Sequence, residues 1–227
     1  KLIARDAFNG TVLWSREIPK WHNQLWPLKS GPSQLARRLV VAGDKLFVTM
    51  SIEGPMECLD ATSGKTLHIF KGSEQTEEII VENGTAFVLT REGKWELDEY
   101  LPKHNVGDQA RVRTEFVWDA TPRTIKAYDA EKGSLLWEKK DKIAPITMSV
   151  AEGCLVYHDG EDVVCLDRDT GQEKWRSEKA SRRTLIPFNF APRLVIYEDV
   201  VLYAGGDGKM KGYDLKSGKT LWESTHD

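Results

Sequence analysis

The sequence has 227 residues, of which 40% are hydrophobic and 30% charged, and its formal net charge is -3 at pH 7. This composition excludes a disordered or collagen-like chain. No basic run is longer than a pair such as Arg37-Arg38 or Arg182-Arg183, so no nucleic-acid partner is expected. No stretch approaches the roughly 18 apolar residues that a membrane span needs, so no transmembrane segment is expected.

The first predicted element is a two-stranded hairpin over residues 1–18. Its centre reads RDAFNGTVLW, in which Asp6 is followed by Gly10 and Trp14. An Asp side chain can accept hydrogen bonds from backbone N–H groups two residues ahead, and Gly supplies the positive φ that lets the chain turn back. Ala4, a small residue, stands two positions before the Asp.

The same Asp-x3-Gly-x3-Trp unit recurs four more times along the chain, with His68 in place of Trp once. Its anchors are Asp60, Gly64 and His68; Asp129, Gly133 and Trp137; Asp167, Gly171 and Trp175; and Asp214, Gly218 and Trp222. The small residues before these Asp residues are Cys58, Ala127, Cys165 and Gly212. With Cys154, the three cysteines are too few and too scattered for a disulfide framework or a metal site, and we expect free thiols.

Each of the four later units follows a second β-rich hairpin, whose turn is Gly43-Asp44, Asn83-Gly84, Glu152-Gly153 or Glu198-Asp199. Four short antiparallel strands that recur at this period are typical of β-propeller blades. The sequence therefore predicts an all-β propeller segment over residues 1–227. It comprises a half blade at 1–18 and complete blades at about 36–72, 76–140, 146–178 and 193–225, the second blade carrying an insertion at 91–123.

The pattern Ala-x-Asp-x-x-x-Gly-x-x-x-Trp resembles the tryptophan-docking repeat of pyrroloquinoline-quinone-type (PQQ-type) β-propellers, over nearly the whole chain. The resemblance implies that each Trp lies flat on the backbone of the next blade, near the small residue, in a structural role. It also implies a full ring of about eight blades, so that either further blades are missing or two chains cooperate. Quinoprotein alcohol dehydrogenases and the non-catalytic outer-membrane assembly lipoprotein share the repeat, which implies a periplasmic or cell-envelope location. Residues 21–40 are further similar to planctomycete multidomain proteins that carry such propellers.

Three long connections, 19–36, the insertion 91–123 and 176–192, are the predicted places for binding, because long loops on a rigid scaffold commonly carry function. The candidate ligand or partner contacts in them are Trp21, His22, Trp26, Lys29, Trp95, His104, Trp118, Arg182 and Arg183. Each has a structural alternative. The tryptophans can pack under their own loops, the histidines lack a second metal ligand, the insertion can be an exposed flap, and the arginine pair can be solvated. Gly205-Gly206-Asp207-Gly208 looks like a phosphate loop but stands between two strands, which predicts a turn.

Two functions from different classes fit these observations. The first is a non-catalytic scaffold or interaction module of a larger bacterial cell-envelope protein, which binds a protein partner or positions covalently linked neighbouring domains. The alternative is a fragment of a PQQ-dependent dehydrogenase, and a propeller that binds a carbohydrate or another small ligand is a further alternative. The resemblance implies that a quinone enzyme would need a calcium ion, a catalytic Asp and, in many members, two adjacent cysteines.

No two cysteines adjoin in this sequence, and no catalytic motif such as GxSxG, HExxH or a Walker loop is present. We therefore expect no catalytic residue, no metal site and no cofactor within these residues. PQQ with calcium would bind only if blades outside this sequence complete a site.

Overall fold

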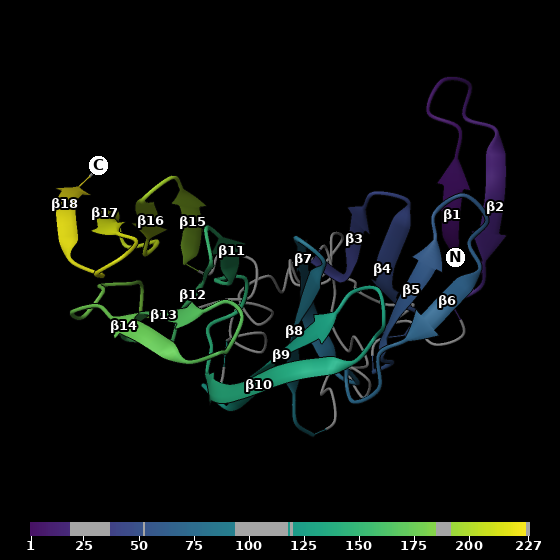
Figure 1. The fold of residues 1–227 in the computed structure, drawn as a ribbon. Coiled ribbons are helices and arrows are strands. Elements are labelled where there is room, and N and C mark those ends of the chain that lie inside the picture. Colours follow the sequence, from purple (N-terminus) through teal and green to yellow (C-terminus); the bar gives the residue numbers. More distant parts are fainter. Residues whose placement is uncertain (19–36, 52, 94–117, 119, 185–191, 226–227) are drawn as a thin grey trace, which may run out of the picture.

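The computed structural model describes residues 1–18, 37–51, 53–93, 118, 120–184 and 192–225. Within these ranges the chain forms one two-stranded and four four-stranded antiparallel sheets (Figure 1). In each sheet the strands pair in the order in which they follow one another along the chain. The predicted all-β architecture of four-stranded antiparallel sheets is confirmed.

The strands group into a half blade and four blades. The half blade is β1 (Leu2–Arg5) and β2 (Val12–Arg16). Blade 1 is β3 (Leu39–Ala42), β4 (Lys45–Thr49), β5 (Met56–Asp60) and β6 (Thr66–Ile69). Blade 2 is β7 (Thr76–Glu82), β8 (Thr85–Arg91), β9 (Pro122–Asp129) and β10 (Leu135–Lys142). Blade 3 is β11 (Ser149–Ala151), β12 (Cys154–His158), β13 (Val163–Asp167) and β14 (Glu173–Arg176). Blade 4 is β15 (Arg193–Tyr197), β16 (Val200–Ala204), β17 (Lys209–Asp214) and β18 (Thr220–Thr225).

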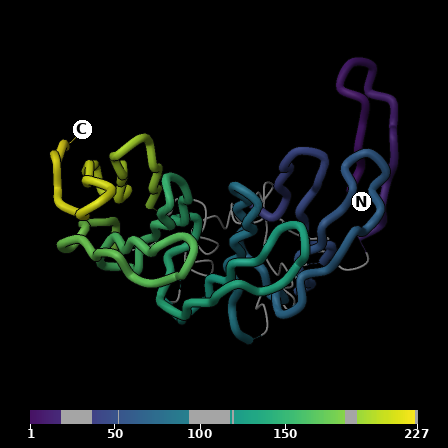
Figure 2. The backbone as a smooth tube through the Cα atoms, viewed as in Figure 1, coloured from purple at the N-terminus to yellow at the C-terminus, as the bar shows by residue number. Residues whose placement is uncertain are grey.

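The sheets stand one after another along an open arc, with the half blade at one tip and β18 at the other (Figures 1 and 2). The first strands of neighbouring blades contact each other: β3 lies against β7, β7 against β11, and β11 against β15. The first strand of each blade is thus its innermost strand, and the last is the outermost.

The repeat turn forms because its hydrogen bonds are local. In the third blade, Asp167 Oδ1 accepts the N–H groups of Asp169 at 3.2 Å and Thr170 at 3.0 Å. The N–H of Gly171 then donates to the Asp167 carbonyl at 2.9 Å, and Gly171 has φ +70°. The same Gly to Asp backbone bond closes the other four repeat turns. A glycine is needed at this position because other residues rarely adopt that φ.

The two tight turns of each blade lie at the same end of the blade. Residues one past the repeat Asp donate backbone hydrogen bonds to the other turn: Ala61 to Asp44, Ala130 to Gly84, Arg168 to Gly153 and Leu215 to Asp199, at 2.8–3.1 Å. We call this the turn end. The described connections between hairpins and between blades, such as 70–75 and 159–162, lie at the opposite end, which we call the loop end.

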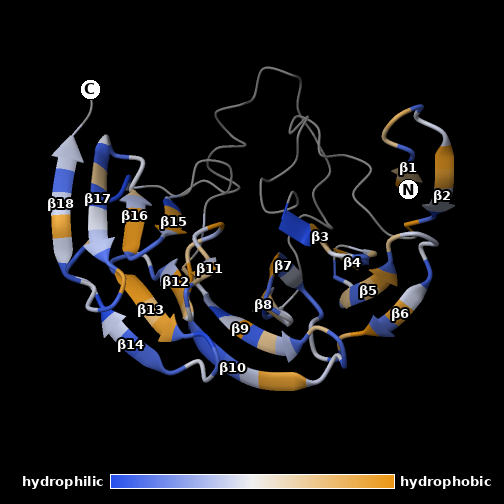
Figure 3. Cartoon of the chain, turned by 45° about the horizontal axis from the view of Figure 1, so that its top comes forward, coloured by the Kyte–Doolittle hydropathy of each residue, from blue (hydrophilic) through white to orange (hydrophobic). Residues whose placement is uncertain are grey.

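The hydrophobic core is divided among the junctions between sheets. Val163 and Cys165 of β13 face blade 4, whereas Val164 and Leu166 of the same strand face blade 2. β13, the third strand of blade 3, is thus apolar on both faces, and the outermost strand β14 is mostly hydrophilic (Figure 3). Similar cores lie between blades 1 and 2 and between the half blade and blade 1. Each blade is therefore held chiefly by its two neighbours.

Candidate functional site

Trp175 joins blade 3 to blade 4 at the turn end. Its ring lies against Cys165, which is its partner across the strands of its own sheet. On the other side it covers the repeat glycine of the next blade, because a Cβ added to Gly218 would lie 2.4 Å from the ring. The indole N–H donates to the Leu215 carbonyl at 2.7 Å, and Trp175 is only 8% exposed. The indole is thus sandwiched between two blades.

The same contact, which we call the docking lock, recurs at the other junctions. Trp14 covers Gly64 and donates to the Ala61 carbonyl at 2.9 Å. Trp137 covers Gly171 and donates to the Arg168 carbonyl at 2.9 Å. His68 takes the same place over Gly133. The small residue before each Asp belongs to the blade of the Trp, and the glycine belongs to the next blade.

A second group of side chains gathers at the loop end of the innermost strands. Arg37 forms an ion pair with Glu78, whose side chain is 1% exposed, and also donates to the Met148 carbonyl at 3.3 Å. Burial raises the pKa of Glu78, and the charge of Arg37 opposes this rise. These contacts tie blades 1, 2 and 3 together near the axis of the arc.

The neighbouring acid is also held by an arginine. Glu77 Oε2 lies 3.2 Å from Arg123 Nε, and both side chains are 1% exposed. Arg123 Nη1 also donates to the carbonyl and the hydroxyl of Thr121, each at 2.6 Å. A buried pair of this kind needs such additional hydrogen bonds, because removal of two charges from water is costly.

Two further arginines complete this group. Arg38 is 2% exposed, and burial lowers its pKa to about 10 against the opposing charge of Glu77. Burial and the charge of Arg37 lower the pKa of Arg193, which opens β15. The inner cluster, as we name it, is Arg37, Arg38, Glu77, Glu78, Arg123 and Arg193. Its guanidinium groups create a positive environment that disfavours a bound cation.

Trp118 and Arg182 come together around Gly160, in the loop between β12 and β13. A Cβ on Gly160 would lie 2.7 Å from the Trp118 ring, and Arg182 Nε donates to the Gly160 carbonyl at 2.5 Å. Arg182 Nη1 also donates to the carbonyls of Arg183 and Thr184 at 2.9 and 3.0 Å. Arg182 therefore links the loop between β12 and β13 to residues 183–184 by hydrogen bonds.

His158 lies beneath the same loop. Its Nδ1 accepts the N–H of Gly160 at 2.9 Å, and its ring stacks on Tyr203 of blade 4 with centroids 5.1 Å apart. Tyr203 donates to the Ser181 carbonyl at 3.0 Å. Burial lowers the pKa of His158 to about 4, so the imidazole is neutral at pH 7. These contacts join blades 3 and 4 at the loop end.

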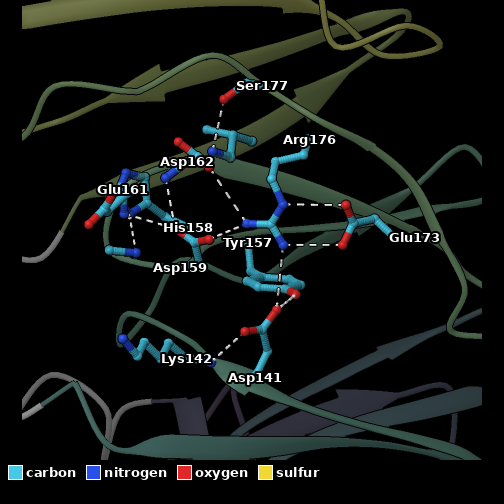
Figure 4. A network of polar contacts seen from close by, with 12 residues as sticks. Asp141, Lys142, Tyr157, His158, Asp159, Glu161, Asp162, Glu173, Arg176 and Ser177 are labelled. Atoms are coloured by element: carbon cyan, nitrogen blue, oxygen red, sulfur yellow. Dashed lines mark hydrogen bonds and ion pairs between the residues drawn. The ribbon is translucent and has the colours of Figure 1, made fainter.

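Arg176 is surrounded by carboxylates on the outer side of blade 3 (Figure 4). Its guanidinium pairs with Glu173 at 3.1 Å, with Asp141 of β10 at 3.8 Å, with Asp162 at 3.7 Å and with Asp159. Burial works against the charged form, but hydrogen bonds and charges from Glu173 and Asp159 raise the pKa of Arg176. The arginine thereby links blades 2 and 3.

The structure places three of the nine candidate contacts. Trp118 and Arg182 both contact Gly160, whereas the backbone N–H of Arg183 donates to the Gly205 carbonyl at 3.1 Å. The turn predicted at 205–208 lies between β16 and β17. The other candidates lie outside the described residues: Trp21, His22, Trp26, Lys29, Trp95 and His104.

Sequence reasoning missed the inner cluster and His158. One signal was available, because the double acid Glu77-Glu78 directly precedes the apolar run Ile79-Ile80-Val81. Two adjacent charges at the start of a buried strand cannot both point to solvent, since successive side chains alternate between faces. Their arginine partners could not be inferred in the same way, because they lie about 40 residues away along the chain.

The described residues do not fit a quinone cofactor with calcium. Calcium prefers carboxylate and carbonyl oxygens, and the two buried acids near the axis already face guanidinium groups. Cys58, Cys154 and Cys165 are buried free thiols in the blade cores, and none adjoins another in sequence. No three His, Cys, Asp or Glu side chains in the described ranges are grouped to hold a metal ion. In the same ranges no helix has the length and apolar character to cross a membrane.

Comparison with known families assigns the repeat. The profile of the family described as outer membrane protein assembly factor BamB matches residues 106–226, which is more than half of the chain. The chain belongs to this family. Its PQQ-type repeat and propeller fold thus agree with the resemblance seen in the sequence.

The individual relatives of this BamB-type chain include both dehydrogenases and BamB itself. It is 28% identical over 145 residues to methanol dehydrogenase [cytochrome c] subunit 1 of Paracoccus denitrificans, a match that covers 52% of this chain and 22% of that protein. The crystal structure of BamB from Moraxella catarrhalis matches with a TM-score of 0.57 at 19% identity, over 98% of this chain and 54% of that chain.

A quinohemoprotein alcohol dehydrogenase from Comamonas testosteroni matches with a TM-score of 0.60 at 15% identity, over 98% of this chain and 40% of that chain. The chain spans well under two thirds of the length of each of these three proteins. At such identities, the two structural matches show the propeller fold alone.

Proposed function

We propose that the chain is a non-catalytic β-propeller scaffold that binds a protein partner in the bacterial cell envelope. The observation that carries the proposal is the inner cluster, in which Glu77 and Glu78 are both paired with arginines. In a propeller that binds a metal-dependent cofactor near its axis, carboxylates there would have to remain open to the cation. Here Glu78 joins blade 2 to Arg37 at the start of blade 1, and Glu77 is held within blade 2 by Arg123.

The location of the interaction follows from the distribution of polar contacts. The turn end is occupied by the docking locks, whereas the loop end carries the length variation among the blades. The family description, outer membrane protein assembly factor, supports a protein partner and a cell-envelope location. We assign the partner-binding surface to the loop end on these grounds.

Calorimetric titration of the 227-residue chain with PQQ and Ca²⁺, with the absorbance of the quinone recorded in parallel, tests the proposal. We expect neither heat of binding nor a shift of the absorbance band. Stoichiometric binding would overturn the scaffold function. A double variant Arg37→Gln and Arg123→Gln serves as the control: if Ca²⁺ binds to it and not to the unsubstituted chain, the arginines are the groups that exclude the cation.

The second candidate is a part of a PQQ-dependent dehydrogenase. It is favoured by the 28% identity to methanol dehydrogenase subunit 1, which extends over 145 residues. Stoichiometric binding in the same titration would favour this candidate, because only the dehydrogenase function requires quinone and calcium to bind.

A further inference from the structure

The chain contains the tripeptide Asn-Gly-Thr twice, at residues 9–11 and 83–85, and no other asparagine of the sequence precedes a glycine. An asparagine can modify itself when the backbone nitrogen of the next residue attacks its side-chain carbonyl carbon. Glycine as the next residue favours the attack, because it has no Cβ to obstruct it and leaves the backbone free to adapt. Both Asn-Gly pairs are exposed and lie in hairpin turns, so the same residues can be compared in two environments.

In the half blade, the turn that joins β1 and β2 holds both reacting groups by hydrogen bonds. The attacking nitrogen is that of Gly10, and its N–H donates to the Asp6 carbonyl at 2.9 Å. The carbonyl oxygen of the Asn9 side chain accepts the Thr11 N–H at 2.9 Å. Attack therefore requires the Gly10 hydrogen bond to break, and any rotation of the Asn9 side chain costs its bond to Thr11.

In blade 2, the turn that joins β7 and β8 leaves the attacking nitrogen open. Asn83 and Gly84 have φ +45° and +77°, and Glu82 and Thr85 pair directly on either side of them. The Gly84 carbonyl accepts the Ala130 N–H at 2.9 Å, but the Gly84 N–H forms no hydrogen bond within the residues that the structure describes. A Cβ added to Gly84 would meet nothing within 4 Å, so the space around it is open. This nitrogen thus lacks the bond that engages its counterpart in the half blade.

The same turn contacts an arginine of blade 3. Arg168 Nη2 donates to the Glu82 carbonyl at 2.7 Å and to the Asn83 carbonyl at 3.2 Å. Its Nε also lies 2.7 Å from Glu82 Oε2, and the Arg168 side chain is only 13% exposed. The Asn83 side chain donates to the other carboxylate oxygen of Glu82 through Nδ2. The main-chain carbonyl of Asn83 is thus held beside a positive charge.

We propose that Asn83 is a site of spontaneous conversion to isoaspartate, and that Arg168 directs the second of its two steps. In the first step Gly84 N bonds to Asn83 Cγ, the Cγ–Nδ2 bond breaks, and the nitrogen leaves as ammonia with the hydrogen of Gly84 N. The product is a cyclic succinimide. In the second step water adds to one ring carbonyl and breaks its bond to nitrogen. Addition at the main-chain carbon gives isoaspartate, and addition at Cγ gives aspartate.

Arg168 favours the isoaspartate product because of where its guanidinium lies. Addition of water at the main-chain carbon places negative charge on the carbonyl oxygen of residue 83, to which Arg168 donates. A cationic donor at the place where charge develops stabilises the transition state. The isoaspartate carries its free carboxylate on the same carbon, beside Arg168, and its main chain is longer by one methylene group.

Peptide mapping by mass spectrometry, after incubation of the folded chain at mildly alkaline pH, tests the first step. We expect Asn83 to react at least about tenfold faster than Asn9, because the cost of breaking a hydrogen bond changes a rate by roughly that factor. In guanidinium chloride the two sites share their tripeptide without their turns and should react at similar rates. Equal rates in the folded chain would overturn the proposal. The same difference in the unfolded chain would also overturn it, because the turns would then not be its cause.

The ratio of isoaspartate to aspartate at residue 83 tests the role of Arg168. Isoaspartate is measured by methylation with a protein isoaspartyl methyltransferase, which does not accept aspartate. Arg168→Gln should lower the ratio at residue 83 at least about threefold and leave the ratio at residue 9 unchanged. Arg168→Lys, which keeps the positive charge, should retain most of the bias. An unchanged ratio in Arg168→Gln would show that Arg168 does not direct the second step.

Conversion should also loosen the junction between blades 2 and 3. The added methylene lengthens the turn and displaces the Gly84 carbonyl that accepts from Ala130 and the Asn83 carbonyl that accepts from Arg168. The isoaspartate form, isolated by anion exchange, should unfold at lower urea concentration than Asn83→Asp. This variant is the matched control, because it carries the same charge on a main chain of ordinary length and aspartate tolerates a positive φ. Equal midpoints would contradict a role of this turn in the junction.

Discussion

Two junctions of the propeller perform the same task with different residues. Between blades 3 and 4, Trp175 covers Gly218 and donates a hydrogen bond to the Leu215 carbonyl. Between blades 1 and 2, the smaller His68 covers Gly133. A histidine ring is smaller than an indole, and Phe70 supplies additional aromatic volume beside it. Phe70 is fully buried, and its ring centroid lies 4.7 Å from that of His68.

The two junctions differ in how they provide the aromatic packing and the hydrogen bond of a docking lock. Phe70 also contacts Tyr128 at 5.4 Å and Phe47 at 6.0 Å, so the junction of blades 1 and 2 spreads its aromatic packing over several side chains. At the junction of blades 3 and 4, one indole provides both the packing and the hydrogen bond. Loss of a single ring should therefore be more damaging at the second junction than at the first.

The largest expected effect is that of Trp175→Ala. Removal of this buried ring and of its hydrogen bond should lower the free energy of unfolding by about 3–5 kcal/mol. His68→Ala should cost roughly 1–2 kcal/mol, because His68 is half-buried and Phe70 remains in place. Urea unfolding followed by circular dichroism measures both. Equal losses would show that the indole is not the dominant contact at its junction.

A second difference between the junctions is the pH dependence of their histidines. The pKa of buried His158 is lowered to about 4 in the fold, from 6.5 when exposed. Its neutral form is the one that accepts the Gly160 N–H. Above pH 6.5 the full stability is present. As the pH falls from 6.5 to 4, the unfolded chain takes up a proton that the folded chain does not, which costs about 3 kcal/mol.

Unfolding free energies measured across this pH range check the expected loss. His158→Gln keeps a group that can accept from Gly160 but does not titrate, so the difference between the two pH profiles isolates the histidine. Burial shifts the pKa of His68 in the same direction, but the ring is only half-buried and we expect a smaller slope from it. A profile of His158→Gln that matches the unsubstituted chain would contradict the prediction.

A third test compares the two docking glycines themselves. Gly218 and Gly133 share φ +71°, but an added Cβ would lie 2.4 Å from Trp175 in one case and 2.9 Å from His68 in the other. Gly218→Ala should therefore cost about 2–3 kcal/mol, and Gly133→Ala about 1–2 kcal/mol. Gly84→Ala, with φ +77° and open space around it, measures the backbone strain alone. If Gly84→Ala lowers the midpoint of thermal unfolding as much as Gly218→Ala does, backbone strain and not displacement of the ring causes the loss of stability.

The sequence predicted the turns well because their hydrogen bonds are local. Asp60 accepts from Ser63 at 2.7 Å and Gly64 donates to Asp60 at 2.8 Å, all within five residues. The ion pairs between blades could not be assigned in this way. Arg168 and Glu82 are 86 residues apart, and a chain with 32 basic and 35 acidic residues offers far too many alternative pairs.

The contacts of the docking residues could be predicted from the sequence only in part. The spacing of Cys165 and Trp175 around a hairpin indicates that they face each other, because cross-strand partners follow from a turn position. That the same ring also covers Gly218 depends on how two sheets pack, which no local pattern specifies. Trp118 on Gly160 was missed for the same reason, since Gly160 stands outside the repeat.

The smallest expected effect is a gain. His68→Trp converts the docking lock of blades 1 and 2 into the form seen at the other junctions, and the Ala130 carbonyl occupies the position of the Ala61, Arg168 and Leu215 carbonyls that accept from the other indoles. The additional hydrogen bond and buried area favour the fold, whereas Phe70 at 4.7 Å limits the space for a larger ring. We expect a net gain of about 1 kcal/mol, seen as a higher midpoint of thermal unfolding.

The gain should grow when Phe70 is made smaller. In the Phe70→Leu background the indole has room to lie flat on Gly133, so His68→Trp should stabilise this background by more than it stabilises the unsubstituted chain. Equal gains in both backgrounds would show that Phe70 and the docking residue act independently. That result would contradict the idea that aromatic volume has moved from position 68 to position 70 at this junction.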